Sequence, residues 1–410
     1  MTTEPRVLRA HEWDTWSDRL VAAFGGVESR EERELIRELT EVDRSLAVWD
    51  GGAVVGSASA SSFRVTVPGG SAVPAAGVTM VHVTATHRRR GILRSMMRRQ
   101  LDDVREAGAE PLAVLTASEP EIYGRFGYGL ATRQMGVEID TSRTRFEVPD
   151  GDAVNLRVVD DPSSVLERCE AVYARRVPGR PGMLARQPGW ERWPLLDPEQ
   201  EREGASPLRC VLAERDGETV GYARYAMKDA SDTWGVPCGE VLLRDLEALD
   251  PVAYAELWRY LGGVDLTTVL RSPNRPVDDP LAHLVSDVRK CRMRVRDGMF
   301  LRPVEVGAAL AARTYAVPVD MVLDVEDAFC PWNAGRWRLS GDAKGAVCER
   351  TTGRPDLALS VRELGAAYLG GESLLSLAMA GRVRELRGGA VAEASAAFAG
   401  AVAPWLPHGF

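Results

Sequence analysis

Three consecutive arginines followed by a glycine, Arg88 to Gly91, are the stretch of this sequence best suited to holding a polyanion. The stretch lies between β-forming residues 77–83 and a segment, residues 92–104, whose apolar positions recur at helical spacing. The first turn of a helix has unpaired backbone N–H groups and partial positive charge, and a glycine lets a phosphate come close to them. The pattern predicts a phosphate site at a helix N-terminus. The alternative is a basic, solvated helix start.

The motif of this loop and the charge of the chain argue against a Walker A site, a dinucleotide-binding turn and a broad nucleic-acid-binding surface. Six arginines cluster in a chain of net charge −8: Arg88, Arg89, Arg90, Arg94, Arg98 and Arg99. The loop lacks the Gly-Lys-Ser/Thr of a Walker A motif and the glycine trio of a dinucleotide-binding turn. The acidic balance makes a broad nucleic-acid-binding surface unexpected and favours cationic substrates.

Two tyrosines and the chain end are the candidate proton carriers. Tyr123 and Tyr128 lie in a glycine-rich stretch and are neutral at pH 7, so either can donate a proton. Their alternative role is to anchor a turn by packing. The tail, residues 404–410, is apolar and stiffened by prolines, so we expect it to be ordered and to place the carboxylate of Phe410 as a proton acceptor. His408 is an alternative base, and an ordered but non-catalytic tail is the other possibility.

The elements that position these residues belong to a chain of several domains. At 410 residues we expect two or three domains. No apolar run reaches the roughly 18 residues of a membrane helix, and no apolar signal core begins the sequence, so we expect no membrane association. The six cysteines are scattered without Cys-x-x-Cys pairs or a histidine cluster, which argues against disulfides and a metal site and for a reducing cytoplasm.

The first and middle parts of the chain follow the same plan. Strands predicted at residues 46–49 and 53–55 flank Asp50-Gly51, and the pattern recurs around Asp216-Gly217. Gly56 and Gly221 differ by 165 positions, and this offset carries the strand before the arginine loop onto residues 240–246. The second copy replaces the loop by residues 247–250 and then begins a helix with Asp250 as N-cap. The repeat predicts a duplicated α/β fold.

Other elements are predicted from periodicity alone. A strand at residues 63–67 is expected to end at a Pro-Gly-Gly turn, and a further strand at residues 112–115 follows the helix that Gly108 closes. From about Val304, strand patterns at residues 321–325 and 337–339 precede alanine-rich helical stretches. The last part of the chain is therefore predicted to be a compact α+β module with its helices at the end.

Several motifs together resemble one acetyltransferase family. Val81-His82-Val83 followed by Arg88-Arg89-Arg90-Gly91-Ile92-Leu93 resembles the acetyl-CoA motif of the GNAT superfamily, although Leu93 replaces its usual small final residue. Combined with Ser118-Glu119 and residues 122–129, Ile-Tyr-Gly-Arg-Phe-Gly-Tyr-Gly, the pattern resembles the Eis (enhanced intracellular survival) family. The resemblance covers essentially the whole chain, including residues 366–371 and Phe410.

The resemblance implies a mixed α/β (α+β) fold of tandem GNAT-like domains and a C-terminal sterol-carrier-like domain. The expected divisions are residues 1–150, which bind acetyl-CoA, residues 151–300, a degenerate GNAT-like domain without cofactor, and residues 301–410. The implied catalytic residues are Tyr123 as general acid and the Phe410 carboxylate as base. The implied acetyl-CoA-binding residues are Val81, His82, Val83, Arg89, Arg90, Gly91, Ile92, Leu93, Arg94, Ser118 and Glu119.

The implied reaction is acetyl transfer from acetyl-CoA to a primary amine by direct attack. Aminoglycoside-like or polyamine-like small molecules are the implied acceptors, and relatives form hexamers. One alternative is acetylation of protein lysines. Another is an apolar-ligand- or partner-binding protein with vestigial catalysis, against which the retained Arg88–Arg94 loop and Tyr123 argue.

Overall fold

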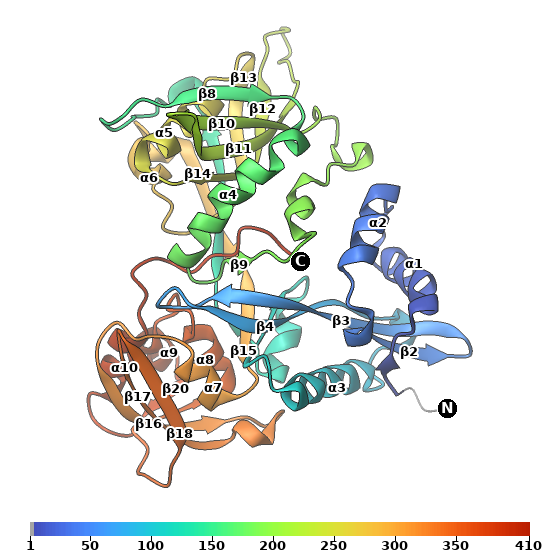
Figure 1. The fold of residues 1–410 in the computed structure, drawn as a ribbon, viewed down its shortest axis with the longest axis vertical. Coiled ribbons are helices and arrows are strands. Elements are labelled where there is room, and N and C mark those ends of the chain that lie inside the picture. The colour runs from blue at the N-terminus through green and yellow to red at the C-terminus, as the bar shows by residue number, and fades with distance from the viewer. Residues whose placement is uncertain (1–3) are drawn as a thin grey trace.

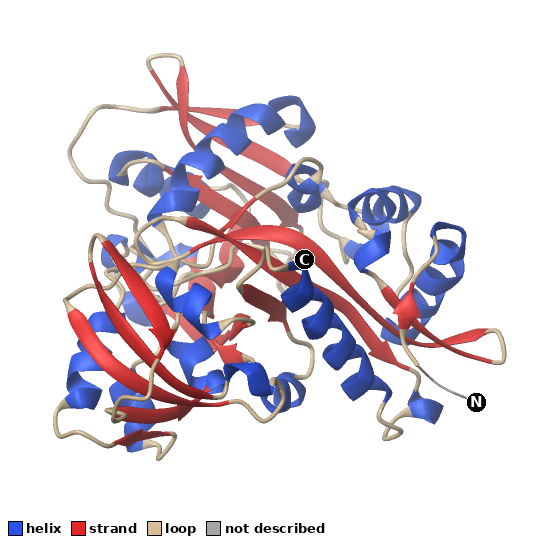
Figure 2. Cartoon of the chain, turned by 60° about the horizontal axis from the view of Figure 1, so that its bottom comes forward, coloured by secondary structure: helices blue, strands red, loops and turns tan. Residues whose placement is uncertain are grey.

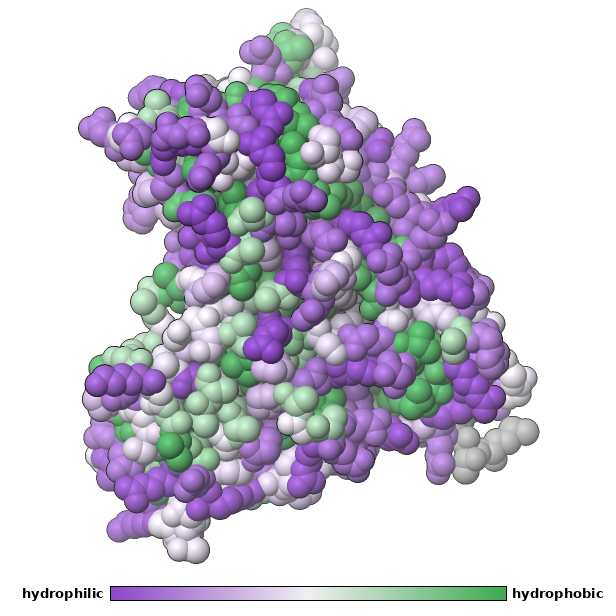
Figure 3. Space-filling view, in the orientation of Figure 1, coloured by the Kyte–Doolittle hydropathy of each residue, from purple (hydrophilic) through white to green (hydrophobic). Residues whose placement is uncertain are grey.

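The strands of this computed structural model, which describes residues 4–410, form three sheets that meet near the C-terminus. In Figure 1 the second sheet lies at the top, the third at the lower left, and the first runs through the lower right half. In the same orientation, Figure 3 shows a face that is mostly hydrophilic and hollowed between the upper and lower left parts. The last residues of the chain therefore lie at the junction of all three parts.

The first sheet carries the predicted phosphate loop between two of its strands. Its strand order is β1 (Arg6–Val7), β2 (Leu46–Asp50), β3 (Ala53–Thr66), β4 (Ala72–Val83), β5 (Leu112–Thr116), β15 (Met299–Pro303) and β6 (Gly129–Leu130), with β9 (Leu184–Ala185) on β3. Its helices are α1 (Trp13–Phe24), α2 (Arg30–Leu39) and α3 (Ile92–Ala107). The apolar stripe of α3 packs on the sheet through Met96, Met97 and Leu101. The predicted helix and its end at Gly108 are confirmed.

The second sheet has seven strands and two longer helices. Its order is β14 (Cys291–Asp297), β7 (Arg133–Asp140), β13 (Thr267–Arg275), β12 (Gly239–Ala248), β11 (Glu218–Lys228), β10 (Arg209–Arg215) and β8 (Asn155–Val159). Its helices are α4 (Leu166–Arg176), α5 (Pro251–Gly262) and the short α6 (Leu281–Leu284). Helix α5 packs over one face through Leu257, Trp258 and Leu261, which are fully buried.

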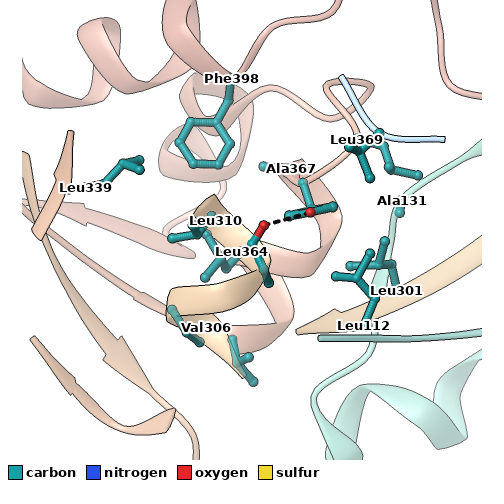
Figure 4. Close-up of a cluster of buried hydrophobic side chains, with 14 of the residues drawn as sticks. Leu112, Ala131, Leu301, Val306, Leu310, Leu339, Leu364, Ala367, Leu369 and Phe398 are labelled. Atoms are coloured by element: carbon teal, nitrogen blue, oxygen red, sulfur yellow. Dashed lines mark hydrogen bonds between the residues drawn. The ribbon is translucent and has the colours of Figure 1, made fainter. Parts of the chain in front are cut away.

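The third sheet belongs to the C-terminal module, whose core continues into the first sheet. Its order is β18 (Gly345–Arg350), β17 (Gly335–Asp342), β16 (Val319–Glu326), β19 (Leu357–Ser360) and β20 (Val383–Glu385), with α7 (Val306–Ala311), α8 (Val361–Ala367), α9 (Leu374–Met379) and α10 (Ala390–Phe398). Figure 4 shows Leu310, Leu364 and Phe398 of this module in one buried cluster with Leu112 and Leu301 of the first sheet. Burial of this shared cluster joins the two parts.

Two strands are exchanged between the first and second sheets. Strand β7 follows β6 in the chain but lies in the second sheet, whereas β15 follows β14 but lies in the first. The segments that connect β6 to β7 and β14 to β15 are hydrogen-bonded to each other. Gly298 N–H donates to the Thr132 carbonyl at 3.0 Å, and Met299 N–H donates to Thr132 Oγ1 at 2.8 Å. The predicted divisions near residues 150 and 300 stay predictions.

The predicted duplication is confirmed by the first hairpin of each sheet. Val48 pairs with Gly56 in the first sheet and Ala213 with Gly221 in the second, and both pairs are related by 165 positions (213 − 48 and 221 − 56). In both hairpins the register shifts directly after this pair. Both glycines let a helix pack closely against the strand. A Cβ on Gly56 would lie 2.8 Å from Ile92 of α3, and one on Gly221 would lie 3.1 Å from Leu257 of α5.

The two copies differ at the N-terminus of the helix. Helix α3 begins after Gly91, whose position offers no side-chain cap. Helix α5 begins after Asp250, whose carboxylate accepts from the N–H groups of Val252 and Ala253 at 3.0 Å and pairs with Arg215 at 2.9 Å. The negative charge that a helix N-terminus favours is thus supplied to α5 by its own chain.

Replacing the cap of α5 should destabilise the second sheet's domain. We expect Asp250→Ala to lower the free energy of unfolding by about 1–2 kcal/mol, because two helix N–H groups lose their acceptor. Asp250→Asn, which keeps the acceptor, should cost clearly less. Urea unfolding of both variants measures the difference, and equal losses would contradict a capping role.

The strands predicted from periodicity can be compared with the strands of the structure. The strand predicted at residues 63–67 and its end before the Pro-Gly-Gly turn are confirmed, but it is not a separate strand, because these residues continue β3, which runs unbroken from Ala53 to Thr66. The strands predicted at residues 321–325 and 337–339 are confirmed within β16 and β17. Across residues 4–410 no helix is long and apolar enough to cross a membrane, and no cluster of His, Cys, Asp and Glu suits a metal ion.

Candidate active site

The parallel strands β4 and β5 separate where the site begins. They pair over only three positions, the last being Gly77 with Val114, while β4 continues to Val83 and β5 to Thr116. Beyond Gly77, the edge of β4 that faces β5 therefore has no strand partner within the described part of the chain. Free backbone amides and carbonyls along an edge can bind an extended, amide-bearing ligand.

A bulge in β4 marks the same point. Between the pairs Ser59–Thr79 and Ser57–His82, two residues of β4, Met80 and Val81, lie opposite one residue of β3. Met80 has a φ of +54°, and its carbonyl accepts from Ser57 Oγ at 2.9 Å. A bulge bends the strand that carries it, and this one lies where the pairing of β4 with β5 has ended.

The loop after β4 leads directly to the free N-terminus of α3. A 3-10 turn, η3 (Ala85–His87), is followed by the arginines and by Gly91, which has a φ of +84°. A Cβ on Gly91 would meet nothing within 4 Å, so the space next to the first helical turn is open. The structure thus has the uncapped helix N-terminus that the sequence predicts for an anion.

The arginine cluster divides into two groups. Arg88, Arg89 and Arg90 are exposed, and no ion pair involves any of them among residues 4–410. In contrast, the Arg98 guanidinium lies 4.2 Å from the ring centroid of Phe329 in the C-terminal module and donates to its carbonyl. The first group is available to a phosphate, whereas Arg98 connects α3 to the C-terminal module.

The other predicted donor-binding residues lie along the same strand, loop and helix. Val81, His82 and Val83 are half-buried on the free part of β4. Three more follow on the first turn of α3: Ile92, which is buried, Leu93, which is half-buried, and Arg94, which is exposed with its guanidinium 5.8 Å from the Phe329 ring centroid. Ser118 and Glu119 are exposed in the loop after β5.

Tyr123 lies beyond the end of β5 on the 3-10 helix η4 (Pro120–Phe126). It is half-buried, and burial together with the charge of Glu119 raises the pKa of its phenol. Its ring is edge-on to Tyr128 at a centroid distance of 6.2 Å. Tyr128 is fully buried, and its hydroxyl has no hydrogen-bond partner within residues 4–410. Of the two phenols, only that of Tyr123 is partly exposed, and its raised pKa keeps it protonated at neutral pH.

The tail places Phe410 where β4 and β5 separate. Thr79 Oγ1 donates to an oxygen of Phe410 at 3.1 Å. The Phe410 ring packs on Phe63 at a centroid distance of 4.8 Å, and a Cβ on Gly77 would come within 3.2 Å of it. Figures 1 and 2 both show the C-terminus in the middle of the molecule. The predicted ordered tail is confirmed.

His408 is fixed in a neutral form. Its Nε2 accepts from Arg186 Nε at 3.1 Å, and its Nδ1 lies 3.0 Å from the Gly409 carbonyl, so Nδ1 carries the proton. Burial and the charge of Arg186 lower the pKa of His408 to about 3. The hydrogen bond from Arg186 to Nε2 and the lowered pKa both disfavour this imidazole as a base near neutral pH.

A cavity of about 410 Å3, here called the interdomain cavity, opens beside this arrangement. Thr116 and Ala117 at the end of β5 form one wall, and the tail from Leu406 to Gly409 forms another. The remaining walls come from strands of the second sheet, from Tyr173 of α4, from Arg186 after β9 and from the segment that contains Trp193. The cavity is large enough for a small molecule, and it lies between the end of β5 and the tail.

Sequence reasoning missed the residues that hold these parts in place. Thr79 binds the tail, Arg186 fixes His408, and the buried Arg302 of β15 donates to the Phe126 carbonyl at the end of η4. None of them forms a local motif, since their partners lie between 176 and 331 positions away along the chain.

Sequence profiles of three domains match the chain. An acetyltransferase (GNAT) domain matches residues 4–131, a second acetyltransferase (GNAT) domain matches residues 182–303, and a sterol carrier protein domain matches residues 306–407. The predicted fold class, two GNAT domains followed by a sterol-carrier-like domain in a mixed α/β chain, is confirmed.

Individual relatives extend over most or all of the chain. A Streptomyces avermitilis protein named uncharacterized N-acetyltransferase is 65% identical over 100% of both chains. N-acetyltransferase Eis of Mycobacterium tuberculosis is 36% identical, with 88% of each chain covered. The crystal structure of Eis1 from Mycobacterium abscessus has a TM-score of 0.84 at 34% identity and covers 100% of both chains.

Proposed function

Since the chain belongs to the Eis family of GNAT N-acetyltransferases and is an acyltransferase, we propose that it acetylates a primary amine of a small molecule with acetyl-CoA as donor. The observation that carries the proposal is the open, uncapped N-terminus of α3 directly after the unpaired edge of β4. Aminoglycoside-like and polyamine-like amines are the acceptors that the family resemblance implies. A hexamer is the assembly that it implies.

The residues of the first domain fit a bound acyl-CoA. The N–H groups at the start of α3, with Arg89, Arg90 and Arg94, would hold the diphosphate, and the free edge of β4 at Val81 and Val83 would pair with the pantetheine amides. Ser118 and Glu119 would border the pantetheine at the end of β5. In the second domain, the Asp250 carboxylate already occupies the corresponding helix end, so we propose that it binds no donor.

Two groups would move protons during transfer. When bound, acetyl-CoA supplies an activated acetyl group whose thiolate leaves. Tyr123, kept protonated by its raised pKa, would donate to the departing sulfur. The Phe410 carboxylate, held by Thr79, would accept the proton of the incoming ammonium through a water molecule, because a carboxylate is a weak base.

A binding experiment on Gly91 tests the donor site. We expect Gly91→Val to raise the Kd for acetyl-CoA about tenfold or more, because the side chain enters the space next to the helix N–H groups. The matched control is Gly108→Val at the other end of α3, which also replaces a left-handed glycine. Both variants should lose similar stability, by about 1–2 kcal/mol for the left-handed conformation. Calorimetric titration showing equal affinities, or no binding by the native protein, would refute the proposal.

The terminal carboxylate can be moved while the ring stays. Extending the chain by one glycine after Phe410 should lower kcat on the order of ten- to hundredfold, because the acceptor oxygen leaves Thr79. Phe410→Leu, which keeps the carboxylate and loses the contact with Phe63, should retain more of the rate. Steady-state thiol release measures both, and an unchanged rate for the extended chain would remove the carboxylate from the mechanism.

Acetylation of protein lysines is the second candidate within the same class. The interdomain cavity favours a small acceptor, because it is enclosed on several sides by the tail, by β5 and by the second sheet. Acetyl transfer to a free amine but not to lysines of a folded protein would agree with this choice.

A further inference from the structure

We infer that the second domain holds the C-terminal tail in place for catalysis, with Asn274 of β13 as the positioning residue for the Phe410 carboxylate. The inference rests on the proposed function, in which that carboxylate accepts a proton, and deepens it. It gives the domain that we propose binds no donor a part in the reaction of the first.

The parallel strands of the two copies separate at equivalent positions. In the first sheet the last pair of β4 with β5 is Gly77 with Val114, and in the second sheet the last pair of β12 with β13 is Leu242 with Arg271. Gly77 and Leu242 differ by the same 165 positions that relate the two hairpins (242 − 77). Both β12 and β13 continue beyond this pair. The second copy therefore keeps the gap that exposes backbone groups in the first.

In the second copy, groups of the chain itself bind at this gap. Arg275 Nη1 donates to the Leu246 carbonyl, which belongs to the separated part of β12, at 2.9 Å. The same guanidinium carbon lies 5.4 Å from the ring centroid of Trp405 in the tail. Arg275 thus contacts both the separated strand and the tail.

Asn274 binds three consecutive residues of the tail. Its Nδ2 donates to the carbonyls of Leu406 at 2.9 Å and Pro407 at 3.0 Å. Its Oδ1 accepts from the indole N–H of Trp405 at 2.7 Å. A single amide side chain therefore fixes the path of the tail backbone at this point.

The position of Asn274 in its strand corresponds to the donor side of the first domain. Asn274 is the third residue after Arg271, and Ala117 is the third residue after Val114. Ala117 directly precedes Ser118, which we propose borders the pantetheine. Where the first domain would bind the amides of the donor, the second domain binds peptide groups of the tail.

The tail is also held just before these residues. Asp278 Oδ2 accepts from the Ala403 N–H at 2.8 Å, and Arg180 Nη1 donates to the Ala403 carbonyl at 2.7 Å. Trp405 N–H donates to the Pro181 carbonyl at 2.9 Å. In Figure 1 the tail passes below the second sheet's domain before it reaches the C-terminus.

The distance from this clamp to the carboxylate is short. Three residues of extended chain span at most roughly 11 Å, so the position of Pro407 limits where Phe410 can lie. From the first domain, Thr79 adds one hydrogen bond to an oxygen of Phe410. A shift of the tail at Asn274 would therefore move the proton acceptor relative to the amine.

Replacing Asn274 should slow turnover without weakening donor binding. We expect Asn274→Ala to lower kcat about tenfold and to leave the Kd for acetyl-CoA within about twofold, because the start of α3 and the edge of β4 are unchanged. The Leu406 side chain still packs in the shared core, so the tail stays attached. Asn274→Asp keeps the acceptor for Trp405 but loses the donor to the two carbonyls, and it should lower kcat at least as much.

Tyr260→Phe is the matched control, because it removes a hydrogen bond of the same domain, to Tyr225 at 2.6 Å, that does not involve the tail. It should leave kcat within about twofold. Hydrogen exchange of the Trp405 amide reports on the tail without any substrate, and it should become faster in Asn274→Ala but not in Tyr260→Phe.

A double-mutant cycle shows whether Asn274 acts through the carboxylate. The chain extended by one glycine after Phe410 already has its carboxylate displaced, so Asn274→Ala should change the kcat of the extended chain by less than about twofold. Losses that multiply, a native kcat in Asn274→Ala, or unchanged exchange of the Trp405 amide would overturn the inference and leave the proposed acetyl transfer intact. A native rate for the extended chain would instead remove Phe410 from the proposed mechanism, and the inference with it.

Discussion

Tyr123→Phe should lower kcat on the order of 10²–10⁴-fold while changing the Kd for acetyl-CoA by less than about twofold. The substitution removes one hydroxyl and leaves the ring, so contact area on η4 is preserved. The phenol is half-buried and its pKa is raised, so the native group stays protonated, and able to donate, throughout the neutral range. Single-turnover rates with saturating donor measure the chemical step directly.

Tyr128→Phe is the matched control for this substitution. The Tyr128 hydroxyl is buried without a partner in the described chain, so its removal should leave kcat within about twofold and leave stability equal or higher. Equal rate losses in the two variants would show that the pair acts through packing.

The charge of Glu119 raises the pKa of Tyr123, so Glu119→Gln should move the alkaline fall of kcat to lower pH.

Arg302→Met should lower the free energy of unfolding by about 3–5 kcal/mol. Arg302 on β15 and Asp327 of the C-terminal module form an ion pair with no more than 1% of either side chain exposed. The substitution leaves the Asp327 carboxylate buried without its counter-charge. It also removes the donor to the Phe126 carbonyl, so η4 and Tyr123 should lose a fixed support.

The exposed pair of Arg338 and Asp320 provides the control. Their side chains are 61% and 55% exposed at a separation of 2.8 Å, so Arg338→Met should cost less than about 1 kcal/mol. Urea midpoints of the two variants give the comparison. Similar losses would mean that the buried pair does not connect the first sheet to the C-terminal module as we expect.

The sequence predicted the parts of the fold that depend on local signals. The helix after Gly91, the hairpin turns and the duplication could all be predicted from the sequence. Their signals, which are periodicity, Asp-Gly pairs and a constant offset, lie in short stretches of the chain. The ordered tail was accessible from its prolines and apolar residues. The identity of the family came from the motif around Gly91 together with residues 118–129.

The strand exchange and the residues that hold the candidate site in place could not be predicted from the sequence. Nothing local distinguishes β7 or β15 from a strand that stays in its own sheet, since pairing partners are chosen by long-range packing. The pairing of Arg302 with Asp327 and the fixing of His408 by Arg186 likewise join residues far apart in the chain. The neutral state of His408 therefore needed three-dimensional contacts to be recognised.

The exchange of strands should also determine when the protein becomes active during its synthesis on the ribosome. Domains usually fold as they emerge, N-terminal first. Here β5 receives its neighbour β15 only after residue 303 has been made, and Thr79 receives its partner only with residue 410. A nascent chain that stops before these residues should therefore lack acetyltransferase activity, because the strand beside β5 and the group bonded to Thr79 are still missing.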